Sequence, residues 1–206
     1  MQSSRLQSVK QRVDVAPYRT GDMVVGDTAS VLAVSFGKGD PHKDATTVVF
    51  VDEQGRMREH TKLDSLADSE AKDEFIDIIR RRRPSVIVIG GFTVATTRLS
   101  QSVKNLINPK PQEGEDQTWG NTNSNTNREV FDIPVTYVHD DVARIYQHSK
   151  RAADEFSALS LTAKYCVGLA RYIQSPLNEY AALGPDIAAI SFENEDHHLV
   201  RIPQVF

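Results

Sequence analysis

Two adjacent carboxylates, Asp140 and Asp141, stand where an apolar run gives way to a helical pattern. Carboxylates hold the two divalent ions of many nucleases, about 4 Å apart, one activating water and the other stabilising the leaving oxygen. Such a centre needs three or four converging carboxylates, and Mg²⁺ prefers oxygen ligands in octahedral array. Two neighbours on one element are too few, so the fold decides whether a metal centre exists.

Basic residues gather in two places. The first is a run of four arginines, Arg80, Arg81, Arg82 and Arg83. The run ends an expected helix, where cations complement the macrodipole by about 0.3–1 kcal/mol each, but it also fits a phosphate-binding patch. The second comprises Arg144, His148 and Arg151, which form one basic face of a helix beginning at Asp140. That face is either solvated or a contact for a partner or nucleic acid.

The other reactive residue types show no catalytic spacing. No pair of cysteines accompanies the histidines at zinc-like spacing, and no serine lies on a nucleophile elbow. The run Ser35–Gly39 contains glycines and a lysine but does not follow the Walker pattern of a phosphate loop. The single cysteine, Cys166, lies on the apolar side of an expected helix, which indicates a small core residue. We therefore expect no cofactor and no metal.

The composition is typical of one globular domain. The chain has 206 residues, of which 39% are hydrophobic and 25% charged. Its net charge of -4 gives no global attraction to nucleic acid or to anionic membranes. We expect a lead-in segment over 1–29, which docks on the domain or on a missing neighbour. A domain over 30–192 follows, with a disordered loop at about 108–129, and then a C-terminal extension over 193–206.

Apolar periodicity predicts strands followed by alternating helices and strands. The expected strands span 31–36, 46–52, 56–62, 85–90 and 133–138. The expected helices span 69–83, 94–107, 140–156, 160–174 and 176–183, and a terminal strand or strap covers 186–192. The first three strands form an antiparallel meander with the polar strand 56–62 at the edge. Strand 85–90 lies parallel to strand 31–36, because a helix connects the meander to it.

This order indicates an α/β domain with a mixed five-stranded sheet, the order of the ribonuclease H-like fold. Nucleases of this fold place carboxylates in the first strand, at the end of the central parallel strand, and where the helix after the fifth strand begins. The corresponding residues here are Ser35, Gly90 or Gly91, and Asp140 or Asp141. Only one of the three positions offers an anion. Asp40 and Asp44 in a polar loop, and Asp52 at the far end of a neighbouring strand, are remote substitutes.

The carboxylate count therefore predicts a catalytically inactive module, a pseudonuclease that serves as a structural and interaction domain. Two alternatives stay open. One is an active metal-dependent, structure-specific nuclease. The other is a non-cleaving nucleic-acid-binding module, whose affinity would be salt-sensitive and would depend on Arg80–Arg83.

Four segments carry a resemblance to a known family: REHTKLDSL, PSVIVIGGFTVATTRL, PVTYVHDDVARIYQHSKRA and YCVGLARYIQSPLNEYAALG. They resemble the YqgF (ribonuclease H-like) domain of the eukaryotic transcription elongation factor and histone chaperone suppressor of Ty six, which is related to bacterial Tex. Catalytic relatives read hydrophobic-Asp-x-Gly in the first strand, and Ser35-Phe36-Gly37 matches this motif with the acid lost. Asp140–Arg144 matches the later acidic motif only in part.

The resemblance implies a nuclear, non-catalytic module of a large scaffold. Through the full-length protein, the implied partners are RNA polymerase II and histones. We expect the isolated domain to be monomeric, with weak nucleic-acid binding at most.

Overall fold

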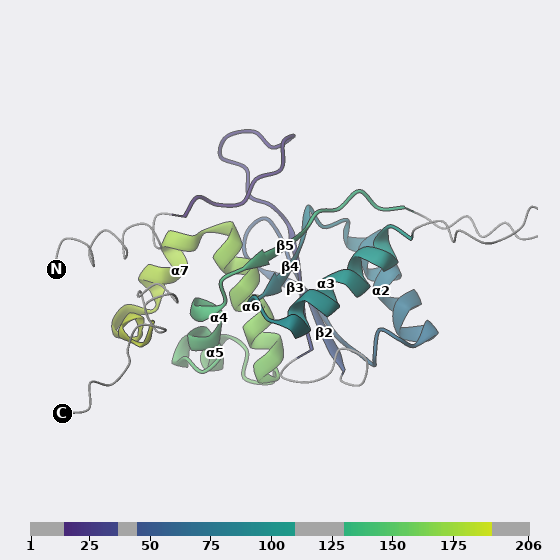
Figure 1. The fold of residues 1–206 in the computed structure, drawn as a ribbon. Helices are drawn as coiled ribbons and strands as arrows, with labels where there is room; N and C mark the ends of the chain where they lie inside the picture. Colours follow the sequence, from purple (N-terminus) through teal and green to yellow (C-terminus); the bar gives the residue numbers. More distant parts are fainter. Residues whose placement is uncertain (1–14, 37–44, 110–129, 191–206) are drawn as a thin grey trace, which may run out of the picture.

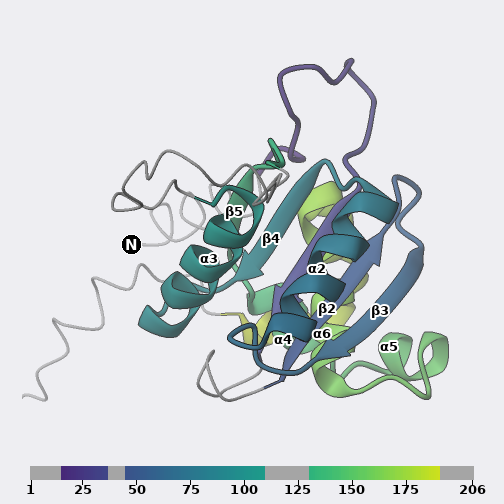
Figure 2. The ribbon, with the colours of Figure 1, turned by 90° about the vertical axis from the view of Figure 1, so that its right-hand side faces the viewer.

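The computed structural model of the 206-residue chain describes residues 15–36, 45–109 and 130–190. The described part is a mixed β-sheet with helices on both faces, as the two views in Figure 1 and Figure 2 show. The predicted C-terminal extension, nearly all of the predicted loop at 108–129, and the candidate ligands Asp40 and Asp44 lie outside the described residues.

The sheet has its five strands in the order β3-β2-β1-β4-β5. They are β1 (Val31–Ser35), β2 (Thr46–Val51), β3 (Met57–Leu63), β4 (Val86–Gly90) and β5 (Val135–Val138). The central strand β1 is antiparallel to β2 and parallel to β4, and β5 is parallel to β4. The polar strand β3 forms an edge, where its charged side chains discourage pairing with another chain. The predicted α/β fold with a mixed five-stranded sheet is confirmed.

Helices cover both faces of this sheet. They are α2 (Ser69–Arg82), α3 (Val94–Ile107), α4 (Asp141–Tyr146), α5 (Lys150–Glu155), α6 (Leu161–Gln174) and α7 (Pro176–Ala182). Because side chains alternate along a strand, Leu32 packs with residues of α2 and α3, whereas Ala33 packs with residues of α4 and α6. All five residues of β1 are buried. Within the described ranges, none of the helices has the length and apolar character needed to cross a membrane.

The first residue of α3, Val94, is 73% exposed. It lies about two and a half turns before the buried Val103, which places it on the opposite side of a helix with 3.6 residues per turn. The helix itself is confirmed over 94–107.

The single helix expected over 140–156 is wrong, because the chain forms α4 and α5 instead. The break lies at Ser149, within the expected helix. Its hydroxyl donates to the carbonyl of Tyr146 at 2.7 Å and accepts from the N–H of Ala152 at 3.1 Å, so it caps the start of α5. Ala153 of α5 is exposed.

The terminal strand or strap expected over 186–192 is also wrong where the structure describes it. A 3₁₀ helix, η1 (Gly184–Ala189), follows α7 instead. Gly184, with a φ of +55°, ends α7, and the proline after it suits the first turn of a helix. Ile190 then packs in a small cluster with Tyr180 of α7.

Residues 15–29 of the expected lead-in segment lie against the domain. The N–H of Tyr18 donates to the carbonyl of Ile173 at 2.9 Å, and Nε2 of Gln174 donates to the carbonyl of Ala29 at 2.8 Å. Figure 1 shows this segment as the purple loop that projects beyond the sheet. Its contacts with the end of α6 fix the approach of the chain to β1.

Helix α6 crosses α4 closely at Gly168. A Cβ atom on this glycine would lie 3.0 Å from Cα of Ala143 and 3.0 Å from the ring of Tyr146. The missing side chain therefore lets the two helices approach. The same crossing brings Tyr165, one turn earlier on α6, to the start of α4.

Replacing Gly168 with valine is expected to lower the free energy of unfolding by about 1–3 kcal/mol, because the added atoms overpack the crossing. Chemical denaturation followed by circular dichroism measures the change. The control is Gly21→Val, since a Cβ atom on Gly21 meets nothing within 4 Å. Equal losses in the two variants would contradict this account of the crossing.

Candidate functional site

The carboxyl ends of the parallel strands bring the predicted site residues together. Val34 pairs with Ile89, so the next residues along, Ser35 and Gly90, lie at the same level. Gly90 pairs in turn with Val138 of β5, and Asp140 follows closely along the chain. Ligands bind most often at this edge of an α/β sheet.

A cavity of about 240 Å³ lies at this edge. Its polar and glycine lining includes Ser35, Gly90, Gly91, Thr93, Thr96, Asp140, Arg144 and Tyr165. Three of the predicted positions thus meet in one cavity. Asp141, the neighbouring candidate, is in the first turn of α4 and does not line it.

The carboxylate of Asp140 is buried, and two protein groups bind it. Its Oδ2 accepts a hydrogen bond from Nε of Arg144 at 2.7 Å and another from the hydroxyl of Tyr165 at 2.9 Å. The hydrogen bond with Asp140 raises the pKa of Arg144 above its ordinary value. Burial and the nearby Asp140 charge raise the pKa of Tyr165 strongly. At neutral pH the carboxylate therefore has a cation and a neutral hydroxyl as partners.

The ends of two side chains of α6 occupy the space beside Gly90. A Cβ atom there would overlap the hydroxyl of Tyr165 and lie 2.7 Å from Cδ2 of Leu169. An acid at the end of β4 would therefore need the side chains of Tyr165 and Leu169 to move. The sequence analysis did not identify Tyr165. The one indication was its residue type at the edge of the apolar stripe of α6, because the ring of a tyrosine can be buried while its hydroxyl forms a hydrogen bond.

These residues do not fit a two-metal centre. In the described part of the chain, no group of three His, Cys, Asp or Glu side chains is placed to hold a metal ion. Asp52, a candidate substitute, follows Val51, which pairs with Val31 at the opposite end of β1 from Ser35. The cavity therefore offers one carboxylate.

The four arginines Arg80 to Arg83 form two pairs with different surroundings. Arg81 and Arg82 bind the carboxylate of Glu59 on β3. Burial raises the pKa of Glu59, but the hydrogen bonds from these two arginines outweigh it, so the pKa lies below its ordinary value. Arg80 and Arg83 instead line a second cavity, of about 520 Å³, together with Phe131.

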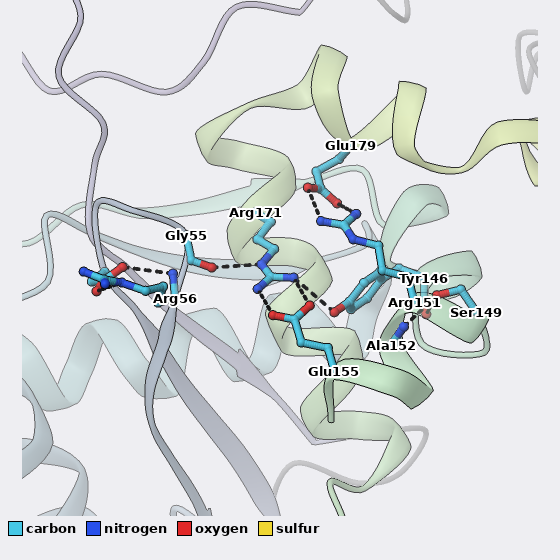
Figure 3. A network of polar contacts seen from close by, with 10 residues as sticks. Gly55, Arg56, Tyr146, Ser149, Arg151, Ala152, Glu155, Arg171 and Glu179 are labelled. Atoms are coloured by element: carbon cyan, nitrogen blue, oxygen red, sulfur yellow. Dashed lines mark hydrogen bonds and ion pairs between the residues drawn. The ribbon is translucent and has the colours of Figure 1, made fainter. Parts of the chain in front are cut away.

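The predicted basic face of Arg144, His148 and Arg151 does not exist as one helix face. Arg144 lies in α4, His148 in the break and Arg151 in α5. Figure 3 shows that Arg151 binds both carboxylate oxygens of Glu179, at 2.9 and 3.1 Å. The hydrogen bond with Glu179 raises the pKa of Arg151.

Arg171 of α6 is the centre of the same network. It donates to the carbonyl of Gly55 at 2.9 Å, to the hydroxyl of Tyr146 at 3.3 Å and to Glu155 at 2.7 Å (Figure 3). Burial raises the pKa of Tyr146 to about 12, so its hydroxyl keeps its proton at neutral pH. These contacts join the β2–β3 turn to α4, α5 and α6.

A comparison with protein families decides the membership of the chain. The family model described as "YqgF: Holliday-junction resolvase-like of SPT6" matches residues 25–184. The chain belongs to this family. The YqgF resemblance inferred from the sequence is confirmed.

Fungal proteins named transcription elongation factor SPT6 are similar to this YqgF chain. The protein of Gibberella zeae is 39% identical, over 88% of this chain and 13% of its own length. That of Mycosarcoma maydis is 43% identical, over 78% of this chain and 10% of its own length. That of Schizosaccharomyces pombe is 38% identical, over 91% of this chain and 12% of its own length. The chain therefore spans only about a tenth to an eighth of these relatives.

One solved structure similar to this chain is the fowlpox virus resolvase in complex with its substrate Holliday junction DNA. The match covers 72% of this chain and 99% of the resolvase chain, with 13% identity and a TM-score of 0.36. At that TM-score the likeness carries no inference about function.

Asp52 gives a pH-dependent test of the far end of the sheet. Burial raises its pKa, but hydrogen bonds from the backbone N–H groups of Arg56 and Gln54 and from the side chain of Arg58 lower it below 3.8 overall. A carboxyl group whose pKa is lower in the folded state than in the unfolded state stabilises the folded state at pH values above the unfolded pKa. This stabilisation is lost as the pH falls through the folded pKa.

Asp52→Asn is therefore expected to be less stable than the wild type at pH 7, with a difference that shrinks as the pH falls below 3.8. Urea denaturation across the acid range measures it. Asp77→Asn, at an exposed ion pair of α2, is the control and is expected to change stability little. A deficit in Asp52→Asn that stays constant with pH would contradict the assignment.

Proposed function

We propose that this chain is a catalytically inactive YqgF module of a transcription elongation factor, and that it acts as a structural and interaction domain. The observation that carries the proposal is the number of carboxylates in the cavity at the strand ends and the groups that bind them. The cavity contains one carboxylate, Asp140, which Arg144 and Tyr165 already bind. A two-metal mechanism needs several carboxylates free to bind metal ions.

The names of the relatives support the transcriptional part of the proposal. In the full-length protein, the module would accompany the transcription machinery with RNA polymerase II, and the same protein would handle histones in the nucleus. The isolated domain is proposed to be monomeric. The role of the module itself would be to offer a stable surface for contacts with other parts of the protein or with partners. Its ion-pair networks support this role, because they hold the helices on the sheet.

The test is a cleavage assay with four-way branched DNA and single-stranded RNA, in Mg²⁺ and in Mn²⁺. The wild type and the double variant Asp140→Ala/Asp141→Ala are expected to leave both substrates intact, because one paired carboxylate cannot assemble the metal centre. If the wild type cleaves either substrate and the double variant does not, the proposal is contradicted. That result would support the alternative, an active structure-specific nuclease.

A second candidate function, nucleic-acid binding without cleavage, rests on Arg80 and Arg83. Both line the 520 Å³ cavity, whereas Arg81 and Arg82 share the carboxylate of Glu59. Clustered arginines bind phosphate, and each phosphate contact adds to the salt dependence of the affinity. The hypothesis therefore assigns phosphate contact to Arg80 and Arg83 at the cavity, where Arg80 also forms an exposed ion pair with Asp77 at 2.9 Å.

Fluorescence anisotropy with labelled single-stranded DNA at low salt tests this second function. Arg80→Gln/Arg83→Gln is expected to weaken binding and to reduce the salt slope by about one per arginine. The matched control, Arg81→Gln/Arg82→Gln, removes the same charge and is expected to weaken binding less. Absence of wild-type binding at low salt, or equal losses in the two variants, would remove the hypothesis.

A further inference from the structure

Asp140 is a buried carboxylate in the cavity, and its negative charge has to be compensated. A buried carboxylate is costly unless an opposite charge and hydrogen bonds compensate it. In a metal-dependent nuclease the metal ions supply that positive charge. Here Asp140 keeps its place at the strand ends, so another group has to compensate it.

The guanidinium of Arg144 supplies this charge. Arg144 lies one helical turn after Asp140, its N–H donates to the Asp140 carbonyl at 2.8 Å, and its Nε reaches back to Oδ2 at 2.7 Å. Its side chain remains 61% exposed, against 12% for Asp140. The arginine is therefore the exposed member of this ion pair, and the carboxylate is the buried one.

Tyr165 occupies the other side of the carboxylate. Its hydroxyl donates to the same Oδ2 at 2.9 Å, and it fills the space into which a side chain on Gly90 would project. Both donors thus use one oxygen of Asp140, and the tyrosine hydroxyl also occupies the space that an acid at the end of β4 would need. The close crossing of α6 over α4 at Gly168 sets the position of this tyrosine.

We infer that Arg144 and Tyr165 together take the place that metal ions hold in a metal-dependent nuclease and keep the site closed to divalent cations. The inference rests on the proposed non-catalytic function and extends it. Loss of the acid at Ser35 is then not the only barrier to metal binding. Returning an acid to Ser35 leaves the guanidinium and the hydroxyl on Oδ2 of Asp140, and a divalent ion that binds through this oxygen has to displace both.

Isothermal titration with Mn²⁺ alone tests the inference on purified chains. The variants are the wild type, Ser35→Asp, and the triple variant Ser35→Asp/Arg144→Gln/Tyr165→Phe. The wild type is expected not to bind, and the triple variant is expected to bind Mn²⁺ on the order of tenfold more tightly than Ser35→Asp, the scale on which groups around a ligand change metal affinity.

The matched control is Ser35→Asp/Arg98→Gln/Tyr137→Phe, which makes the same chemical changes outside the cavity, on α3 and β5. Its Mn²⁺ affinity is expected to equal that of Ser35→Asp. A control that binds as tightly as the triple variant would overturn the inference. So would Ser35→Asp alone binding as tightly as the triple variant, or a folded triple variant that does not bind.

Near-ultraviolet circular dichroism checks that each variant is folded. Where the triple variant is unfolded, Ser35→Asp/Tyr165→Phe takes its place, with an expected affinity above that of Ser35→Asp, and equal affinities would overturn the inference. Binding of Mn²⁺ by the wild type itself would overturn both the inference and the proposed non-catalytic function. The contrary results named above for the variants overturn the inference alone, so the two failures are distinguishable.

Discussion

The buried carboxylate of Asp140, held between Arg144 and Tyr165, is the interaction on which the arrangement of the site depends. The two hydrogen bonds, at 2.7 and 2.9 Å, join the end of β5 to α4 and to α6. The sheet brings Ser35 and Gly90 to the same point through the parallel register of β1 and β4. A position that would bind metal in a nuclease is therefore a junction between elements in this domain.

Close packing and a second ion-pair network make this junction stable. The missing side chain of Gly168 lets α6 approach α4, and that of Gly90 leaves room for Tyr165. Farther along α6, Arg171 joins the turn at Gly55 to Tyr146 and Glu155 (Figure 3). Such partly buried bidentate pairs are geometrically specific, so they fix where the helices lie on the sheet.

Much of the fold could be predicted from the sequence, because the strands are short apolar runs and α2, α3 and α6 carry regular stripes. The break at Ser149 could not, because a serine within a helical pattern is either an interior residue or a cap, and only its contacts with Tyr146 and Ala152 decide. The 3₁₀ helix η1 was missed because its apolar residues fit a strand equally well.

For the site, the sequence placed Ser35, Gly90, Gly91 and Asp140 at one edge, since the order of elements dictates where parallel strands end. It could not predict Tyr165, because the contact of this residue with Asp140 depends on how closely α6 crosses α4. It also grouped Arg80 to Arg83 as one patch, whereas the spatial position of Glu59 on β3 divides them. Contacts between distant segments are what single-sequence patterns omit.

The most direct test of the central claim is the anomalous scattering of Mn²⁺ in a crystal of the wild-type domain soaked at high Mn²⁺ concentration. The account predicts no manganese peak beside Ser35, Gly90 and Asp140, with Arg144 and Tyr165 still bound to the carboxylate. A pair of manganese peaks at Asp140, with Arg144 displaced, would contradict it.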